Sequence, residues 1–291
     1  MKKFSAIVIV LLVSIYFLQC TKSTSIKPTV YMVGDSTVKN GDYIGQFLDS
    51  TKITIENHAL GGTSSRTFQD KGLWDTVYHK LNKGDYVLIQ FGHNDDGPIN
   101  DDFRARGTIK GIGNEAEEID NILTGKHETV HSYGWYLRKI VTQAKEKGAI
   151  PIIMSPIPRN NWEDGKVPKN DASYGLWAKQ IAAEEQVTFI DLNTQMAQKM
   201  EVLGESKITG TYFYERDHTH TSAKGAVMAA SIIIDELKKT TNPITDYIVT
   251  NPILVLPKKR TLFLIGDSTM ADNGNENAVG WGVPFSVHFD T

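Results

Sequence analysis

The stretch Thr29-Val30-Tyr31-Met32-Val33-Gly34-Asp35-Ser36-Thr37 joins a short apolar run to a polar turn. The apolar run is rich in strand-favouring residues and stops at a glycine, which is typical of a buried parallel strand. The Gly-Asp turn predicts that Ser36 starts a helix, where unpaired N–H groups give a partial positive charge. Ser36 is therefore a candidate nucleophile whose N–H can face a developing oxyanion, although a serine here could equally be a plain helix cap.

Further strands and helices alternate along the chain. Runs that predict strands lie at 53–56, as an edge strand, and at 86–91, 150–154 and 187–190, and helical patterns lie at 135–147, 174–185 and 222–239. This alternation indicates a parallel sheet covered by helices on both faces. Ligands bind beyond the carboxyl ends of such strands, so the motifs after 30–33 and 86–91 are expected on one rim.

Two more motifs offer hydrogen-bond donors for an oxyanion. Gly61-Gly62 could bring a backbone N–H close to a substrate oxygen, because glycine lets the backbone approach closely. Asn94, in Gly92-His93-Asn94-Asp95, could donate from its side-chain amide. Each motif alone also fits a simple turn, or an Asx-turn for the asparagine.

A candidate acid–base pair lies in Asp217-His218-Thr219-His220. His220 would take the proton from Ser36, and Asp217 would hold the imidazole in the right tautomer. His218 is the competing candidate, and the two histidines could instead bind a metal. No third ligand stands nearby at a familiar spacing, so a metal is not expected.

The first part of the chain resembles an export signal. Lys2-Lys3 precedes an apolar segment, 6–18, which is shorter than the ~20 residues that a membrane span needs. Cys20, the single cysteine, follows a lipobox-like sequence in which Gln19 replaces the usual small residue. We expect residues 1–20 to be a signal or lipoprotein segment with lipidation at Cys20, residues 21–27 to be a tether, and the protein to be exported. Plain secretion and an uncleaved anchor remain alternatives.

The chain has 291 residues, is 40% hydrophobic and carries a net charge of −3, which suits one or two globular domains and gives no reason to expect a nucleic-acid partner. We expect the first domain at 28–241 and a linker with three prolines at 242–259. The stretch 261–269 repeats the 29–37 pattern, ending again in Gly-Asp-Ser-Thr. Because a single strand cannot bury its own faces, residues 260–291 are expected to be a truncated second copy, inert and poorly ordered on its own.

The four motifs, in this chain order, resemble the four blocks of the SGNH, or GDSL, hydrolases. Flanking residues at 90–95, 133–139 and 155–160 resemble the rhamnogalacturonan acetylesterase branch. The resemblance implies an α/β fold of the flavodoxin-like three-layer α/β/α type, with a five-stranded parallel sheet. It implies Ser36, His220 and Asp217 as the triad, and an oxyanion hole made by the N–H groups of Ser36 and Gly62 and the Asn94 amide.

The implied activity is removal of acetyl groups from pectin backbones without a cofactor. The chain departs from the family pattern at Gly61-Gly62-Thr63, where an Ala-Gly-Arg-like sequence is familiar, and the flanks also suggest Arg66 near the site. The polar segment 96–129 reads as a loop insertion whose cations could meet galacturonate carboxylates. Alternatives are acetylxylan as substrate, an esterase for acyl lipids, and a non-catalytic glycan-binding lipoprotein that touches the membrane only through its lipid anchor.

Overall fold

The computed structural model describes residues 27–257, which form a sandwich around one parallel sheet. The sheet has five strands in the order β2-β1-β3-β6-β7, all paired in parallel. Their bounds are β1 (Thr29–Gly34), β2 (Thr54–Asn57), β3 (Tyr86–Gln90), β6 (Ile150–Met154) and β7 (Thr188–Ile190). The five predicted strands and their parallel pairing are thereby confirmed, including the edge place of β2.

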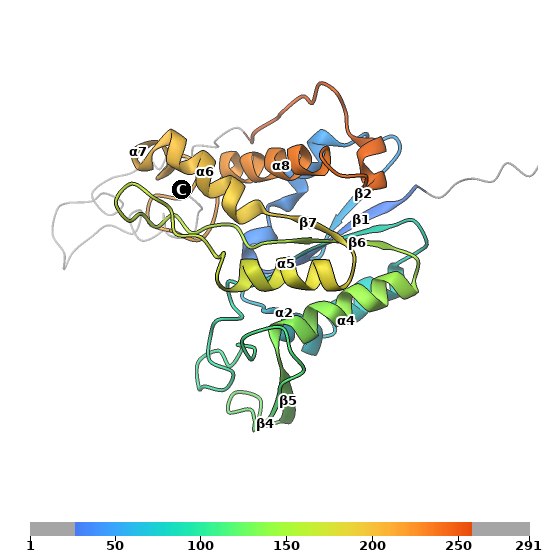
Figure 1. The fold of residues 1–291 in the computed structure, drawn as a ribbon, viewed down its shortest axis with the longest axis vertical. Coiled ribbons are helices and arrows are strands. Elements are labelled where there is room, and N and C mark those ends of the chain that lie inside the picture. The colour runs from blue at the N-terminus through green and yellow to red at the C-terminus, as the bar shows by residue number, and fades with distance from the viewer. Residues whose placement is uncertain (1–26, 258–291) are drawn as a thin grey trace, which may run out of the picture. The chain divides into compact units, whose positions relative to one another are not determined.

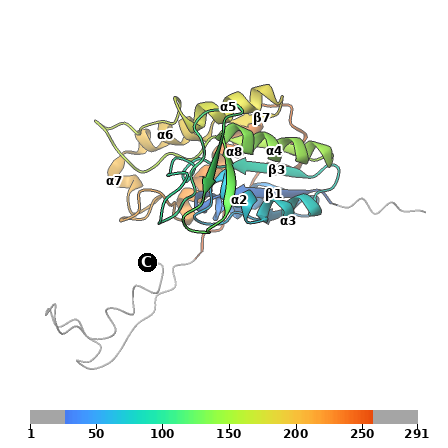
Figure 2. The same cartoon turned by 90° about the horizontal axis from the view of Figure 1, so that it is seen from below.

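Helices cover both faces of the sheet, as Figures 1 and 2 show. One face carries η2 (Gly41–Phe47), α6 (Leu192–Leu203) and α8 (Ala223–Leu237), and the other carries α2 (Ser65–Asp70), α3 (Leu73–Lys80), α4 (Tyr133–Glu146) and α5 (Tyr174–Glu184). Val30 and Met32 enter the first core while Tyr31 and Val33 enter the second. Because successive side chains of a strand point to opposite faces, a strand buried on both faces needs an unbroken apolar run.

Local signals set the ends of the helices. Ser132 caps α4 by accepting a hydrogen bond from the Trp135 N–H at 3.1 Å, and Gly148 follows its C-terminus with a positive φ of 73°. Ser222 caps α8 in the same way. Three short helices complete the described fold: η1 (Ser36–Val38), α7 (Glu205–Ile208) and η3 (Pro243–Tyr247).

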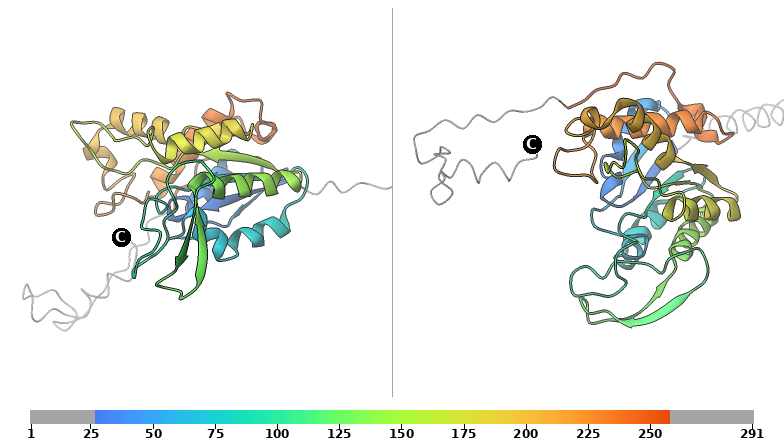
Figure 3. Two further views of the ribbon diagram at one scale, coloured as in Figure 1. Left: turned by 60° about the horizontal axis from the view of Figure 1, so that its bottom comes forward. Right: turned by 60° about the vertical axis from the view of Figure 1, so that its left-hand side comes forward.

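A β-hairpin stands apart from the sheet in a segment that we expected to be loop. Strands β4 (Ala116–Asp120) and β5 (His127–His131) pair antiparallel, next to α2 and α4 and away from the central sheet (Figure 3). Only Ile119 and Val130 of the hairpin are buried. A strand pair with so few buried side chains carries no clear alternation of apolar and polar residues, so its sequence gave no strand signal.

The expected linker begins as part of the folded domain. Ile244 in η3 is fully buried, and the Val249 N–H donates to the Phe47 carbonyl at 2.9 Å. The folded domain therefore extends beyond residue 241, because the apolar side chain of Ile244, directly after Pro243, packs in the core. The signal segment (1–20), most of the tether and the second copy (260–291) lie outside the described residues. Within residues 27–257, no helix combines the length and the apolar character that crossing a membrane requires.

Candidate active site

Ser36 is the first residue of η1, immediately beyond the carboxyl end of β1. The helix cap is Asp35, whose carboxylate accepts hydrogen bonds from the Thr37 N–H at 2.8 Å and the Thr37 hydroxyl at 2.7 Å. Since Asp35 serves as the cap, the Ser36 hydroxyl is available for another partner. A Cβ at Gly34 would lie 2.6 Å from the Gln90 carbonyl oxygen, so the turn needs glycine there.

The Ser36 hydroxyl contacts an imidazole that is held by a carboxylate. His220 Nε2 lies 2.8 Å from Ser36 Oγ, and His220 Nδ1 lies 2.6 Å from Asp217 Oδ2. The other Asp217 oxygen accepts from the Thr219 N–H at 2.8 Å and the His220 N–H at 3.1 Å. Burial raises the pKa of the Asp217 carboxyl, but the hydrogen bonds from His220 and Thr219 outweigh it and leave the pKa below its ordinary value. Asp217 is thus an anion that orients His220.

Gly61-Gly62 lies against the serine. The Leu60 N–H donates to the Gly34 carbonyl at 3.1 Å, which brings the loop after β2 beside the end of β1. A Cβ at Gly61 would lie 3.6 Å from Ser36 Cβ. Gly62 has a φ of 78°, in the left-handed region that favours glycine. Both glycines line the cleft in which Ser36 and His220 lie.

Asn94 reaches the same cleft from the loop after β3. Its side-chain Nδ2 donates to the Thr63 carbonyl at 2.8 Å, so the amide bridges two loops. A primary amide has two N–H donors, and the second is left for a substrate oxygen. Next to it, buried Asp95 accepts from the Ser65 hydroxyl at 2.5 Å. These two bonds fasten the loops that carry Gly62 and Asn94 to each other.

Burial changes the ionisation of two groups beneath the cleft. It raises the pKa of Asp95 to about 7, against the lowering effect of the Ser65 hydrogen bonds. It also lowers the pKa of His93, whose Nε2 finds no hydrogen-bond partner among the described residues.

The cleft has a volume of about 710 Å³ and a strongly cationic wall. Four basic residues line it, namely Lys71, Arg104, Arg106 and Arg159, and no acidic residue does. Within residues 27–257 none of the four forms an ion pair with a carboxylate. Burial, and then the like charge of Arg104, lower the pKa of Arg106. The wall therefore offers unneutralised positive charge to a ligand.

The remaining sequence candidates lie elsewhere. His218 is exposed, and its Nδ1 lies 2.9 Å from the Thr219 hydroxyl, so it does not replace His220. Arg66 is buried outside the cleft, beneath the insertion. Across the described part of the chain, no group of three His, Cys, Asp or Glu side chains could hold a metal. Lys71, between α2 and α3, lines the cleft and was missed because a single cation there carries no motif of its own. Arg159 also lines the cleft; it lies in the flanking stretch 155–160, to which the sequence assigned no role in the site.

The fold and this constellation define a carboxylic ester hydrolase of the SGNH type, with a candidate nucleophile after the first strand and an acid–base pair just before the last long helix. The chain belongs to the GDSL-like lipase/acylhydrolase family, whose sequence profile matches residues 31–227.

Relatives in this family have named activities. A rhamnogalacturonan acetylesterase of Emericella nidulans is 33% identical over 72% of this chain and 85% of that protein. The rhamnogalacturonan acetylesterase RhgT of Bacillus subtilis is 28% identical over 76% of this chain and 94% of that protein. Among solved structures, the YxiM protein of Bacillus subtilis superposes with a TM-score of 0.61 at 23% identity, covering 75% of this chain and 58% of that one. That structural likeness concerns the fold alone.

Proposed function

We propose that this protein is a serine acetylesterase that removes acetyl groups from acetylated rhamnogalacturonan. The observation that carries the mechanism is the continuous contact from Ser36 Oγ through His220 to Asp217, at 2.8 and 2.6 Å. These distances are those of a nucleophile–base–orienting group relay. The named relatives support an acetylated polysaccharide as the substrate class.

The reaction begins when Ser36 Oγ attacks the acetyl carbonyl carbon and His220 Nε2 takes the hydroxyl proton. The N–H groups of Ser36 and Gly62, with the Asn94 amide, stabilise the negative oxygen that forms. As the C–O bond to the sugar breaks, His220 returns the proton to the sugar oxygen. A water then attacks the acetyl-serine, again through His220, releasing acetate and restoring Ser36.

The cationic wall favours a uronate polymer over a neutral one. Arg104 and Arg159 meet no carboxylate within the described part of the chain and so are free to pair with galacturonate. A neutral xylan has no matching charge on its backbone. An esterase for acyl lipids would need a wide apolar rim. The large apolar side chains that line this cleft are Phe103 and Leu123, both exposed.

The test measures acetate released from acetylated rhamnogalacturonan and from acetylxylan, with Ser36→Ala alongside. We expect release from the pectin substrate and a loss of several powers of ten in kcat for the variant, whereas Ser132→Ala, a helix-cap change away from the cleft, keeps its rate. Near-normal release by Ser36→Ala would overturn the mechanism. Glycan binding without release by the folded protein would favour the binding-protein alternative.

A second experiment tests the role of charge. Arg104→Gln should lower kcat/KM on the pectin substrate and leave a neutral aryl acetate unaffected, and added salt should reproduce the loss by screening. Lys110→Gln is the matched control, because Lys110 pairs with Asp96 at 3.0 Å and does not line the cleft. Equal losses for the two variants would refute specific recognition of uronate in the cleft.

We also propose, from the sequence of residues 1–20, that the protein is exported and lipidated at Cys20. A cell expressing the full chain should incorporate labelled fatty acid into it, and Cys20→Ser should abolish the label. Export without label would indicate plain secretion.

A further inference from the structure

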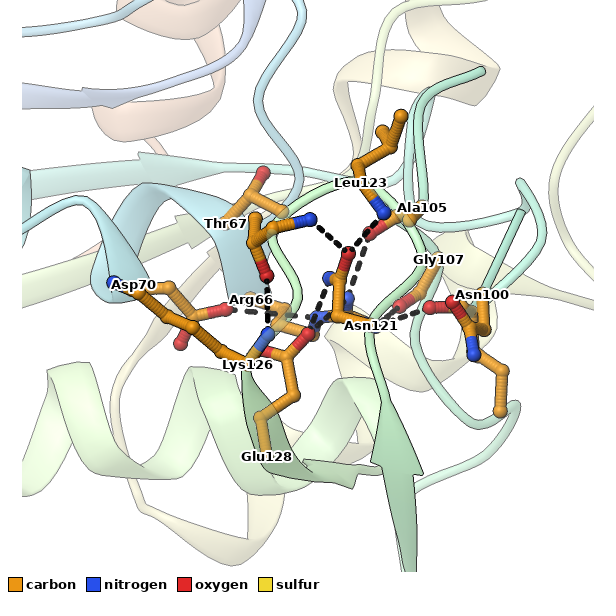
Figure 4. A network of polar contacts seen from close by, with 12 residues as sticks. Arg66, Thr67, Asp70, Asn100, Ala105, Gly107, Asn121, Leu123, Lys126 and Glu128 are labelled. Carbon is orange, nitrogen blue, oxygen red and sulfur yellow. Dashed lines mark hydrogen bonds and ion pairs between the residues drawn. The ribbon is translucent and has the colours of Figure 1, made fainter. Parts of the chain in front are cut away.

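Arg66, on α2, is 1% exposed and points into the insertion that forms one side of the cleft (Figure 4). Its Nη1 donates to the carbonyls of Ile99 at 3.0 Å and Gly107 at 2.8 Å, and its Nη2 donates to the Ala105 carbonyl at 2.6 Å. One guanidinium thus gathers three backbone carbonyls of the segment 99–107. Its planar fork can reach acceptors in several fixed directions, which a lysine ammonium cannot reproduce.

The charge of Arg66 is already balanced inside the protein. Asp70 Oδ2 lies 3.5 Å from Nε, and Glu128 Oε1, from the hairpin strand β5, lies 3.3 Å from Nη2. A buried cation that is paired and hydrogen-bonded in this way is not available to a substrate. Its contacts instead join α2, the segment 99–107 and the hairpin.

The segment that Arg66 holds has a strained backbone, which persists only where surrounding groups hold it in place. Ala105 has a φ of 38°, in the left-handed region that alanine disfavours, and its N–H donates to the Asp101 carboxylate. The same carboxylate accepts from the Arg104 N–H at 2.7 Å. A Cβ at Gly107 would lie 1.8 Å from the Gly97 carbonyl oxygen, so the backbone there passes directly against its neighbour.

Arg106 lies between Ala105 and Gly107, whose carbonyls Arg66 binds, and its side chain reaches the loop that carries Gly62. Its Nη1 donates to the Gly62 carbonyl at 3.0 Å, although the two residues are 44 positions apart. Gly62 is the residue whose own N–H is a proposed oxyanion donor. A hydrogen bond on its carbonyl restricts the rotation of a glycine that otherwise has wide conformational freedom.

We propose that Arg66 is a positioning residue for the oxyanion hole: it fixes the 105–107 backbone so that Arg106 holds Gly62 in its left-handed conformation. Arg66 acts through Arg106 and contacts neither the substrate nor Ser36. The inference rests on the proposed function, because it assigns Gly62 a part in catalysis. It also predicts that the two arginines are energetically coupled, since one acts only through the other.

The test is a double-mutant cycle of Arg66→Lys and Arg106→Ala, assayed with a small neutral aryl acetate so that charge recognition plays no part. Removal of an oxyanion donor lowers kcat about 10²–10³-fold. A donor that is only less firmly positioned should lower kcat less, so we expect a loss of about tenfold in kcat for each single variant, with KM little changed. The kcat of the double variant should also be about tenfold lower than that of the unaltered protein. A product of the two losses, about a hundredfold, would mean independent roles and overturn the proposal.

Hydrogen exchange gives a readout that does not depend on activity. The Thr63 N–H, bonded to the Leu60 carbonyl at 3.4 Å, should exchange faster in both variants, because both release the Gly62 loop. The Gly107 N–H, bonded to the Pro98 carbonyl at 2.8 Å, should respond to Arg66→Lys alone. Unchanged Thr63 exchange in Arg66→Lys would overturn the proposal even if the protein shows no esterase activity.

Two further variants complete the design. Arg138→Lys is the matched control, because Arg138 also donates to an insertion carbonyl, that of Ile112, but makes no contact with 99–107. Arg138→Lys should leave kcat and the exchange of the Thr63 N–H unchanged. If it changed both as much as Arg66→Lys does, the effect of Arg66 would be one of general stability, and the proposal would be overturned. If Arg66→Lys does not fold, Asp101→Ala loosens the same segment from its surface side, and the cycle with Arg106→Ala should be non-additive in the same way.

Discussion

Replacing Asn94 with alanine removes the proposed side-chain oxyanion donor and leaves the proposed triad in place. Asn94 is 8% exposed, and its Nδ2 donates one hydrogen bond to the Thr63 carbonyl at 2.8 Å. The second N–H of this amide is the one proposed to donate to the substrate. Neither bond of the Ser36–His220–Asp217 relay involves Asn94. The variant should therefore keep its nucleophile and its base and lose one donor to the transition state.

The expected loss follows from those contacts. One oxyanion donor contributes about 2.7–4 kcal/mol to the transition state, so kcat should fall about 10²–10³-fold while KM changes little. The lost bond to Thr63 adds a separate cost of roughly 1 kcal/mol to the free energy of unfolding. Initial rates of acetate release over a range of substrate concentrations give kcat and KM, and denaturant unfolding gives the stability.

Asn242→Ala is the matched control for this experiment. Asn242 is 6% exposed, donates from its side chain to the Thr188 hydroxyl at 2.9 Å, and does not line the cleft that holds Ser36. It should lose stability and keep kcat. A kcat for Asn94→Ala within threefold of the control, or a rise in KM alone, would refute the assignment of Asn94 to the oxyanion hole.

Three further outcomes are expected. Asp217→Asn should lower kcat by about 10⁴-fold, measured on an aryl acetate, because His220 Nδ1 loses the carboxylate that sets its tautomer. Burial raises the pKa of Asp95 to about 7, so this carboxyl ionises at a lower pH in the unfolded chain than in the folded protein. The free energy of unfolding should therefore fall by up to about 4 kcal/mol as the pH rises from about 4 to 7. Denaturation of Asp95→Asn across that range should show a flatter dependence. Gly107→Ala should lower Tm, seen by calorimetry, because its Cβ would meet the Gly97 carbonyl oxygen.

The central strands could be predicted because β1, β3 and β6 are buried on both faces and their sequences are almost wholly apolar. Helix α6 was not predicted. Its buried residues include Asn193, which donates to the Pro156 carbonyl at 2.8 Å, so its inner face is partly polar. The hairpin β4–β5 was missed for a related reason, since most of its side chains are charged and exposed.

The candidate site was predictable where a motif stands directly after a strand. Ser36 and Asn94 follow β1 and β3, and neighbouring parallel strands bring their carboxyl ends together. The linkage from Arg66 to Gly62 was not predictable, because it depends on three backbone carbonyls of an irregular segment. No pattern of residue types encodes where such carbonyls point.

The last long helix has a consequence for the order in which the protein is made. Ser36 and His220 are 184 positions apart, and His220 lies just before α8, whose Ser222 cap donates to the Thr211 carbonyl at 2.6 Å. Under the proposed mechanism, a growing chain on the ribosome therefore carries the proposed nucleophile, and both loops around it, long before the proposed base has been translated. On that mechanism, hydrolysis cannot start in a nascent chain until the segment that carries His220 has been translated and folded.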